Sequence, residues 1–178
     1  IEVKIQPDDA TWDAGDIRYN VLRWTSSPNA PFGGYGPSFV NPRTGEIIGA
    51  DIMLEWVYAT NRLTINDIFN NSHGSLDCSI GSLMQEGNMM SYLTSTNKDD
   101  PEILKQSIIR LTLHEVGHTL GLNHNFKASF LHDSKEVHNK ELTQRVGLTS
   151  SVMEYPAVNL APLGVKQGDY YDTRTGPY

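Results

Sequence analysis

Cysteine is nearly absent from this sequence. Cys78 is the only one, so an internal disulfide is excluded. A single thiol fits a reducing compartment, and it fits equally well a secreted bacterial protein that folds without bridges. We interpret Cys78 as a small apolar packing residue, with a thiolate ligand as the alternative.

Long apolar runs and a surplus of basic residues are also missing. No run approaches the roughly 20 apolar residues that cross a bilayer, and no signal peptide is visible. Lys and Arg number 14 against 21 Asp and Glu, which gives a net charge of -7. This balance argues against nucleic acid and anionic membranes as partners. Because the chain begins with Ile1 rather than Met, we expect a piece of a longer protein, with any targeting segment upstream.

With 178 residues, 38% of them hydrophobic, the chain fits one globular domain spanning residues 1–178.

The N-terminal part of the chain carries two patterns that are typical of β-strands. Apolar residues alternate with polar ones over Ile1–Ile5, which predicts a short strand. The β-rich segment Ile17–Trp24 predicts a second strand.

A hairpin is predicted next. Two apolar segments, Tyr35–Val40 and Glu46–Leu54, flank Asn41–Gly45, whose residues suit a tight turn. Pro37 cannot donate to a strand ladder, so the first arm should be a sheet edge and the second arm more central.

A long helix is predicted over residues 101–120. Asp99 or Asp100 can cap it, Pro101 suits its first turn, and Gly121 is well placed to end it. The apolar positions keep helical spacing: Ile103, Leu104, Ile108, Leu111 and Leu120. Residues 55–98 carry weaker patterns, with partial helical spacing over Trp56–Phe69.

The chemistry lies at the end of this helix. Residues 114–124 are His-Glu-Val-Gly-His-Thr-Leu-Gly-Leu-Asn-His. His114 and His118 lie one helical turn apart on the same face, so both imidazoles can bind one ion. Gly121 can turn the backbone sharply and bring His124 back as a third nitrogen ligand. Three histidines plus water form the open site of catalytic zinc, and Glu115 is placed to handle the proton of the water.

The remaining histidines lie in polar surroundings, so we interpret them as ordinary surface or hydrogen-bonding residues: His73, His132 and His138. The pair Asp99-Asp100 leaves structural calcium open, although no EF-hand spacing is present.

The motif resembles that of the metzincin clan of zinc metallopeptidases, whose zinc signature is followed by a Met-turn. Here the Met-turn is Ser151-Val152-Met153-Glu154-Tyr155. The resemblance implies that Met153 lies beneath the zinc. It also implies that Tyr155 binds the metal or donates a hydrogen bond to the transition state.

The resemblance extends to large multidomain bacterial zinc-dependent metallopeptidases. It rests on Ile17–Val21, Gly36–Ile47, Asn159 and Gly168-Asp169. It implies an α/β (α+β) metzincin-like fold, a twisted mixed sheet with an antiparallel edge strand over the active-site helix. An upper subdomain, residues 1–121, would precede a mostly irregular or helical lower one, residues 122–178. Because metzincins begin with a further strand and long helix, part of the upper subdomain would lie upstream.

The implied activity is that of a zinc-dependent endopeptidase, with Zn2+ as cofactor, a zinc-activated water and Glu115 as general base. A protein or peptide substrate would lie extended along the edge strand. The expected contacts are Tyr35, Gly36 and Ser38 on the edge, and Pro156 and Ala157 as the wall of the next pocket.

Two other functions remain open at this point. One is a zinc-bound but non-catalytic module that recognises a peptide or glycan; the presence of Glu115 disfavours it. The other is a zinc hydrolase of a non-peptide amide, which a panel of peptides and acyl-amides would separate. We expect a secreted, periplasmic or cell-surface bacterial protein.

Overall fold

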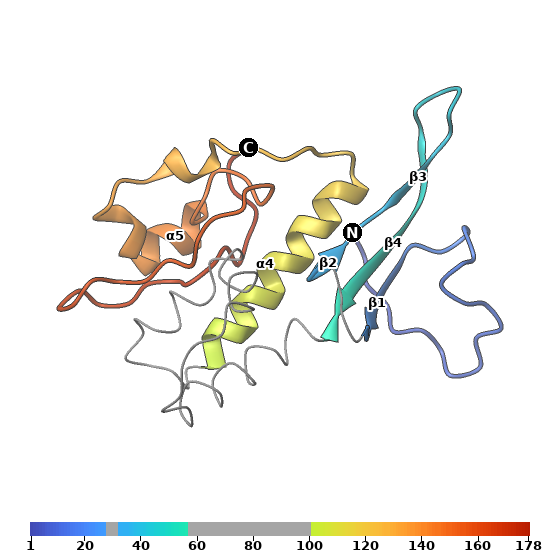
Figure 1. The fold of residues 1–178 in the computed structure, drawn as a ribbon, viewed down its shortest axis with the longest axis horizontal. Helices are drawn as coiled ribbons and strands as arrows, with labels where there is room; N and C mark the ends of the chain where they lie inside the picture. The colour runs from blue at the N-terminus through green and yellow to red at the C-terminus, as the bar shows by residue number, and fades with distance from the viewer. Residues whose placement is uncertain (28–31, 57–100) are drawn as a thin grey trace, which may run out of the picture.

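A long helix separates a small sheet from a loop-rich C-terminal region (Figure 1). The computed structural model describes residues 1–27, 32–56 and 101–178. Within these ranges the elements are β1 (Val21–Thr25), β2 (Gly34–Tyr35), β3 (Ser38–Val40), β4 (Ile47–Glu55), α4 (Pro101–Thr119), η2 (Ala128–Leu131), η3 (Glu136–His138) and α5 (Lys140–Val146). Several predictions lie outside the described residues. They are the partial helical spacing over Trp56–Phe69, of which only Trp56 is described, and those for His73, Cys78 and Asp99-Asp100.

The sheet is mixed, with β4 at its centre. β1 pairs with β4 in parallel, and Val21 lies opposite Asp51. β2 and β3 pair with the other side of β4 antiparallel, so that Ser38 lies opposite Ala50. This mixed sheet with an antiparallel edge beside a long helix confirms the predicted fold class.

The predicted hairpin is present. The amide of Asn41 donates to the Glu46 carbonyl at 2.8 Å, and Gly45 turns the chain with a φ of 75°. Pro37 separates β2 from β3, although its carbonyl still accepts the Asp51 amide at 3.3 Å. The first arm is therefore the interrupted edge that its proline indicates.

The strand predicted over Ile1–Ile5 is wrong. Ile1, Val3 and Ile5 are 94%, 87% and 96% exposed, and no strand forms there. Alternating residues become a strand only where a neighbouring strand takes up their backbone groups. The described residues offer this segment no such neighbour.

The second predicted strand begins later than expected. β1 starts at Val21, because the residues before it form turns. The Asp16 carboxylate accepts the Arg18 amide at 3.1 Å, and the Asp16 carbonyl accepts the Tyr19 amide at 3.0 Å. An aspartate that binds the backbone two residues ahead competes with strand formation.

Helix α4 matches its prediction to within one residue. It ends in a glycine turn, in which Gly121 adopts a φ of 86°. The Gly121 amide donates to the His118 carbonyl at 2.9 Å and the Leu122 amide to the Gly117 carbonyl at 3.0 Å. This pair of bonds is the Schellman pattern, which closes a helix and reverses the chain.

Ile52 and Leu54 of β4 meet Leu111 of α4 in a small apolar core, with Val116 packed against it. This core fixes α4 against the central strand. Beyond α4, the lower region consists of short helices and loops, as predicted. None of the described helices has the length and apolar character of a membrane span.

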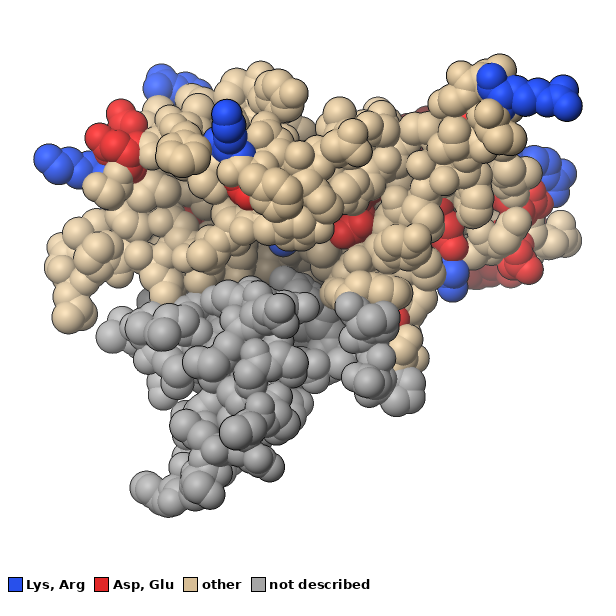
Figure 2. All heavy atoms as spheres, turned by 45° about the horizontal axis from the view of Figure 1, so that its top comes forward, with Lys and Arg blue, Asp and Glu red and all other residues tan. Residues whose placement is uncertain are grey.

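Lys and Arg side chains form no cluster of their own on one face of the described surface (Figure 2). On the face in Figure 2, Lys and Arg stand apart from one another among uncharged residues, and the described residues form no continuous basic patch there. The expectation that nucleic acid is not a partner remains a prediction.

Candidate metal centre

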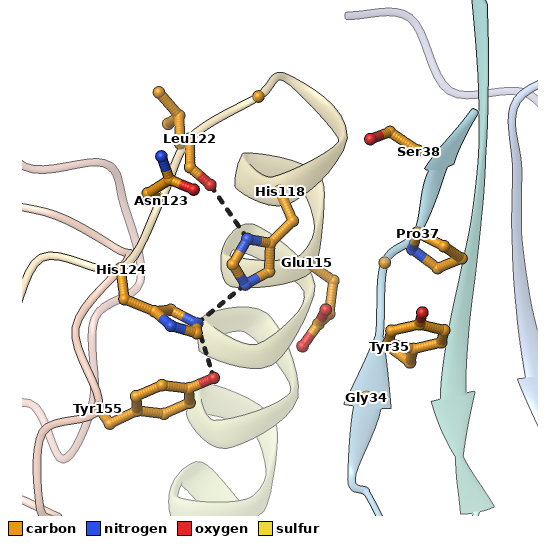
Figure 3. Close-up of a pocket in the computed structure, with 12 residues that line it drawn as sticks. Gly34, Tyr35, Pro37, Ser38, Glu115, His118, Leu122, Asn123, His124 and Tyr155 are labelled. Atoms are coloured by element: carbon orange, nitrogen blue, oxygen red, sulfur yellow. Dashed lines mark hydrogen bonds between the residues drawn. The ribbon is translucent and has the colours of Figure 1, made fainter. Parts of the chain in front are cut away.

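Three histidine side chains converge where α4 ends. His114 and His118 lie one turn apart on the helix, and the chain reverses at Gly121. His124 then faces His118 from the returning chain (Figure 3). One nitrogen from each lies within 4.8 Å of the others. The Nε2 atoms of His118 and His124 are 3.0 Å apart. The structure thus brings together the three predicted ligands.

Backbone carbonyls orient two of these rings. Nδ1 of His114 lies 2.8 Å from the Val152 carbonyl oxygen, and Nδ1 of His118 lies 3.0 Å from that of Leu122. A carbonyl only accepts, so each Nδ1 carries a hydrogen, and in the neutral ring Nε2 then has the lone pair that binds a metal. Such outer contacts hold metal-binding histidines in the required tautomer.

The donor set fits zinc. Nε2 of His114 is buried and has no hydrogen-bond partner among the described residues. A buried polar atom without a partner is costly, and a metal ion would satisfy it. Burial, followed by the nearby Arg110, His118 and His124, lowers the pKa of His114 to about 4. His114 is therefore neutral at neutral pH, as a ligand must be.

Met153 is only 1% exposed, and its sulfur packs against α4 at Gly117. A β-carbon on Gly117 would overlap the Met153 sulfur, so the glycine between His114 and His118 allows this close contact. The Asn125 amide donates to the Met153 carbonyl at 3.0 Å, which ties the loop that carries His124 to the Met-turn.

Tyr155 extends from the Met-turn to the same point. Its hydroxyl oxygen lies 2.8 Å from Nε2 of His124, and the two ring centroids are 4.6 Å apart. The phenol is thus within reach of an ion held by that nitrogen. Burial, and then the charge of Glu115, raise the pKa of Tyr155, so its hydroxyl keeps its proton at neutral pH.

Glu115 is 6% exposed and faces the edge strand β2. A β-carbon on Gly34 would lie 3.1 Å from the carboxylate, and one on Gly36 would lie 2.6 Å from the Glu115 carbonyl oxygen. Burial raises the pKa of Glu115, against smaller lowering effects from His118, the Gly36 amide and Arg110. A carboxylate with a raised pKa is a better proton acceptor.

A pocket of about 550 Å³ opens between β2–β3 and the loop after α4 (Figure 3). It is lined by Gly34, Tyr35, Gly36, Pro37, Ser38, Glu115, His118, Gly121, Leu122, Asn123, His124 and Tyr155. The predicted edge contacts Tyr35, Gly36 and Ser38 lie in this lining. Pro156 and Ala157, predicted as a pocket wall, lie outside it.

Sequence reasoning missed two residues here. The cluster Gly33-Gly34-Tyr35-Gly36 was the signal for Gly34, since glycines often mark close backbone approach. Arg110 donates from Nη2 to the Glu154 carbonyl at 2.7 Å, and its guanidinium lies 5.5 Å from the Tyr155 ring centroid. Its only signal was its place one turn before His114.

Other singled-out residues belong to the lower region. His132 binds the Gly147 carbonyl through Nε2 at 2.8 Å, and neither it nor His138 belongs to the metal cluster. The side-chain Nδ2 of Asn159 donates to the carbonyls of Val137 and Asp169, both at 2.8 Å. Asn159 and Gly168-Asp169 therefore brace the region beneath the site.

Residues 96–178 match a protein family described as Met-zincin. The matched segment holds the whole zinc motif and the Met-turn, so the metzincin prediction is confirmed. No curated protein and no solved structure matches the chain. The likeness to large multidomain bacterial metallopeptidases stays a prediction.

Proposed function

We propose that this chain, whose residues 96–178 belong to the Met-zincin family, is a zinc-dependent endopeptidase. One observation carries the proposal: the three histidine nitrogens converge, and His118 and His124 line a pocket that Glu115 also lines. A metal that only stabilised the fold would not need an open cleft and a buried carboxylate beside it.

His114, His118 and His124 would hold the metal. When bound, zinc would supply Lewis acidity, which lowers the pKa of a water and polarises the scissile carbonyl. The carbonyl contacts of His114 and His118 prepare the site for the ion, because they hold these two rings in one orientation.

Glu115 would accept a proton from the attacking water and pass it to the departing amine nitrogen. The Gly36 amide and the close approach of Gly34 keep its carboxylate in place. Tyr155 would donate a hydrogen bond to the oxyanion that develops on the carbonyl. No covalent intermediate with the protein is required.

The substrate would be an extended peptide that adds to the free edge of β2–β3. Among the described strands, β2 and β3 pair with β4 alone, so their outer backbone groups can pair with another chain. Main-chain pairing is insensitive to sequence, so side-chain pockets would set specificity. We keep Pro156 and Ala157 as the proposed farther wall. A secreted, periplasmic or cell-surface location rests only on the resemblance to bacterial metallopeptidases.

The test is Glu115→Gln, which removes the proton acceptor and keeps side-chain size. Wild-type protein should cleave members of a peptide library. The variant should retain its zinc, and its kcat should be at least about 100-fold lower. Near wild-type cleavage by the variant would remove Glu115 as the base. Cleavage of acyl-amides but not peptides would favour the non-peptide hydrolase, and a zinc-loaded wild type that cleaves neither would favour the binding module.

A further inference from the structure

Arg110 joins the active-site helix to the Met-turn. It lies four residues before His114, one turn away on the same face of α4. Its Nη2 donates to the Glu154 carbonyl at 2.7 Å, across a sequence separation of 44 residues. That carbonyl belongs to the peptide unit that leads into Tyr155, so the contact fixes where the tyrosine begins.

The same guanidinium contacts the Tyr155 ring. Cζ of Arg110 lies 5.5 Å from the ring centroid, within the range of a cation-π interaction. The ring also lies 4.6 Å from that of His124 and 4.8 Å from that of His114, centroid to centroid. Tyr155 is 54% exposed, and Phe126 is a further ring neighbour, 6.2 Å away from centroid to centroid.

Arg110 is an unusual residue to find in this place for packing alone. Its Nε atom is buried and has no hydrogen-bond partner among the described residues. A buried donor without an acceptor is destabilising, and a cation close to a divalent metal adds repulsion. A methionine or leucine would fill the space without either cost, which points to a role in the site.

We propose that Arg110 is a positioning residue that holds Tyr155 in place at the metal centre. It does so twice, through the Glu154 carbonyl and through the face of the ring. With the ring fixed, the hydroxyl stays directed at His124 and at the oxyanion beside it. This inference rests on the proposed peptidase function, in which Tyr155 donates to that oxyanion.

A double-mutant cycle tests the inference. Arg110→Met keeps the length of the side chain and removes its charge and donors, while Tyr155→Phe removes only the hydroxyl. Arg110→Met should lower kcat roughly tenfold with KM changed less than about twofold, and zinc content should be unchanged. In the Tyr155→Phe background it should lower kcat by less than about twofold, because the hydroxyl it positions is already absent.

Two matched variants accompany the cycle. Arg110→Lys keeps the charge and loses the planar guanidinium, so its kcat should lie between that of the wild type and that of Arg110→Met. Lys105→Met removes another cation from the same helix, an exposed one paired with Glu102, and should leave kcat unchanged. An equal loss for Arg110→Met in both backgrounds would assign Arg110 to the fold alone and overturn the proposal, as would an unchanged kcat.

A measurement without turnover keeps the proposal separate from the proposed function. In NMR spectra of the full chain, the Nε-H resonance of Arg110 should be shifted upfield by the aromatic ring, and Tyr155→Leu should abolish the shift. An identical shift in wild type and variant would overturn the proposal even if Arg110→Met failed to fold. A wild type that cleaves no peptide but shows the ring shift would instead contradict the peptidase function.

Discussion

The sheet and the lower region satisfy the hydrogen-bonding groups of their backbones in different ways. In the sheet, β1, β2 and β3 each pair with β4, and Ile52 and Leu54 add an apolar contact with α4. In the lower region, residues 122–178, buried polar side chains take up the amides of loops. Asp172 accepts from the amides of Leu148 and Thr149 at 2.8 and 2.9 Å.

Helix α4 contacts the sheet through Leu111 and the lower region through Gln106. The carbonyl oxygen of this glutamine side chain accepts the amides of Tyr170 and Tyr171 at 2.7 and 3.2 Å, and its Nε2 donates to Asp169 at 3.1 Å. A strand ladder tolerates many side chains, whereas a loop that depends on one carboxylate or amide does not. Substitutions in the lower region should therefore cost more than comparable ones in the sheet.

The largest stability effect is expected for Asp172→Ala. Asp172 is 2% exposed, and its loss leaves the buried amides of Leu148 and Thr149 without their acceptor, whereas the Thr149 hydroxyl can still donate to the Ser151 carbonyl. At about 1–3 kcal/mol for each unsatisfied amide, the free energy of unfolding should fall by about 2–6 kcal/mol. Denaturant unfolding of the metal-free protein measures it.

Asp172→Asn is the matched control. It keeps one acceptor oxygen and the side-chain size, and it removes a carboxylate whose pKa burial raises. Its loss of stability should be well below that of Asp172→Ala. Equal losses for the two variants would mean that the charge, rather than the acceptor, holds these loops.

The pH dependence of the metal-free protein should be intermediate in size. His114 has a folded pKa of about 4, below its ordinary value of 6.5, because it is buried. Between these values the unfolded chain binds a proton that the folded chain does not. The contribution of His114 to the free energy of unfolding is therefore present in full above pH 6.5. It is lost as pH falls towards 4, and the loss amounts to up to roughly 3 kcal/mol.

Comparison with His114→Gln isolates this contribution. The variant lacks the titrating ring, so its unfolding free energy should fall less between pH 7 and pH 4.5 in the absence of zinc. Parallel pH profiles for the two proteins would show that His114 is not a buried neutral histidine.

The smallest effect is expected in the sheet. Arg23 of β1 pairs with Asp51 of β4 at 2.9 Å, and the Arg23 side chain is 42% exposed. Because the strand ladder remains when the ion pair is lost, Arg23→Gln should reduce stability by less than about 1 kcal/mol. A loss as large as that of Asp172→Ala would remove the contrast between the two regions.

The same contrast explains what the sequence predicted. α4, its glycine stop and the hairpin follow from local rules, since helical spacing, Gly121 and the turn at Asn41–Gly45 act on their own neighbours. The convergence of the histidines follows from the same local geometry. The strand predicted over Ile1–Ile5 was wrong because a strand needs a pairing partner, which the alternation of apolar and polar residues cannot reveal.

Arg110 and Gly34 were missed for a related reason. Each acts on a residue far away along the chain, Arg110 on the Met-turn and Gly34 on Glu115. Asn159 and Gly168-Asp169 were singled out only through resemblance, and their bracing role is likewise non-local. Contacts of this kind are set by the folded chain and leave no periodic pattern in the sequence.

The central claim is that His114, His118 and His124 form one zinc site. It is tested most directly by the zinc content of protein purified without chelators, for wild type and His124→Ala. The account predicts one zinc per wild-type chain, removed by chelators or by acidification, and a strongly weakened affinity in the variant. A wild type that holds no zinc and takes up none on reconstitution, or a variant with unchanged affinity, would contradict it.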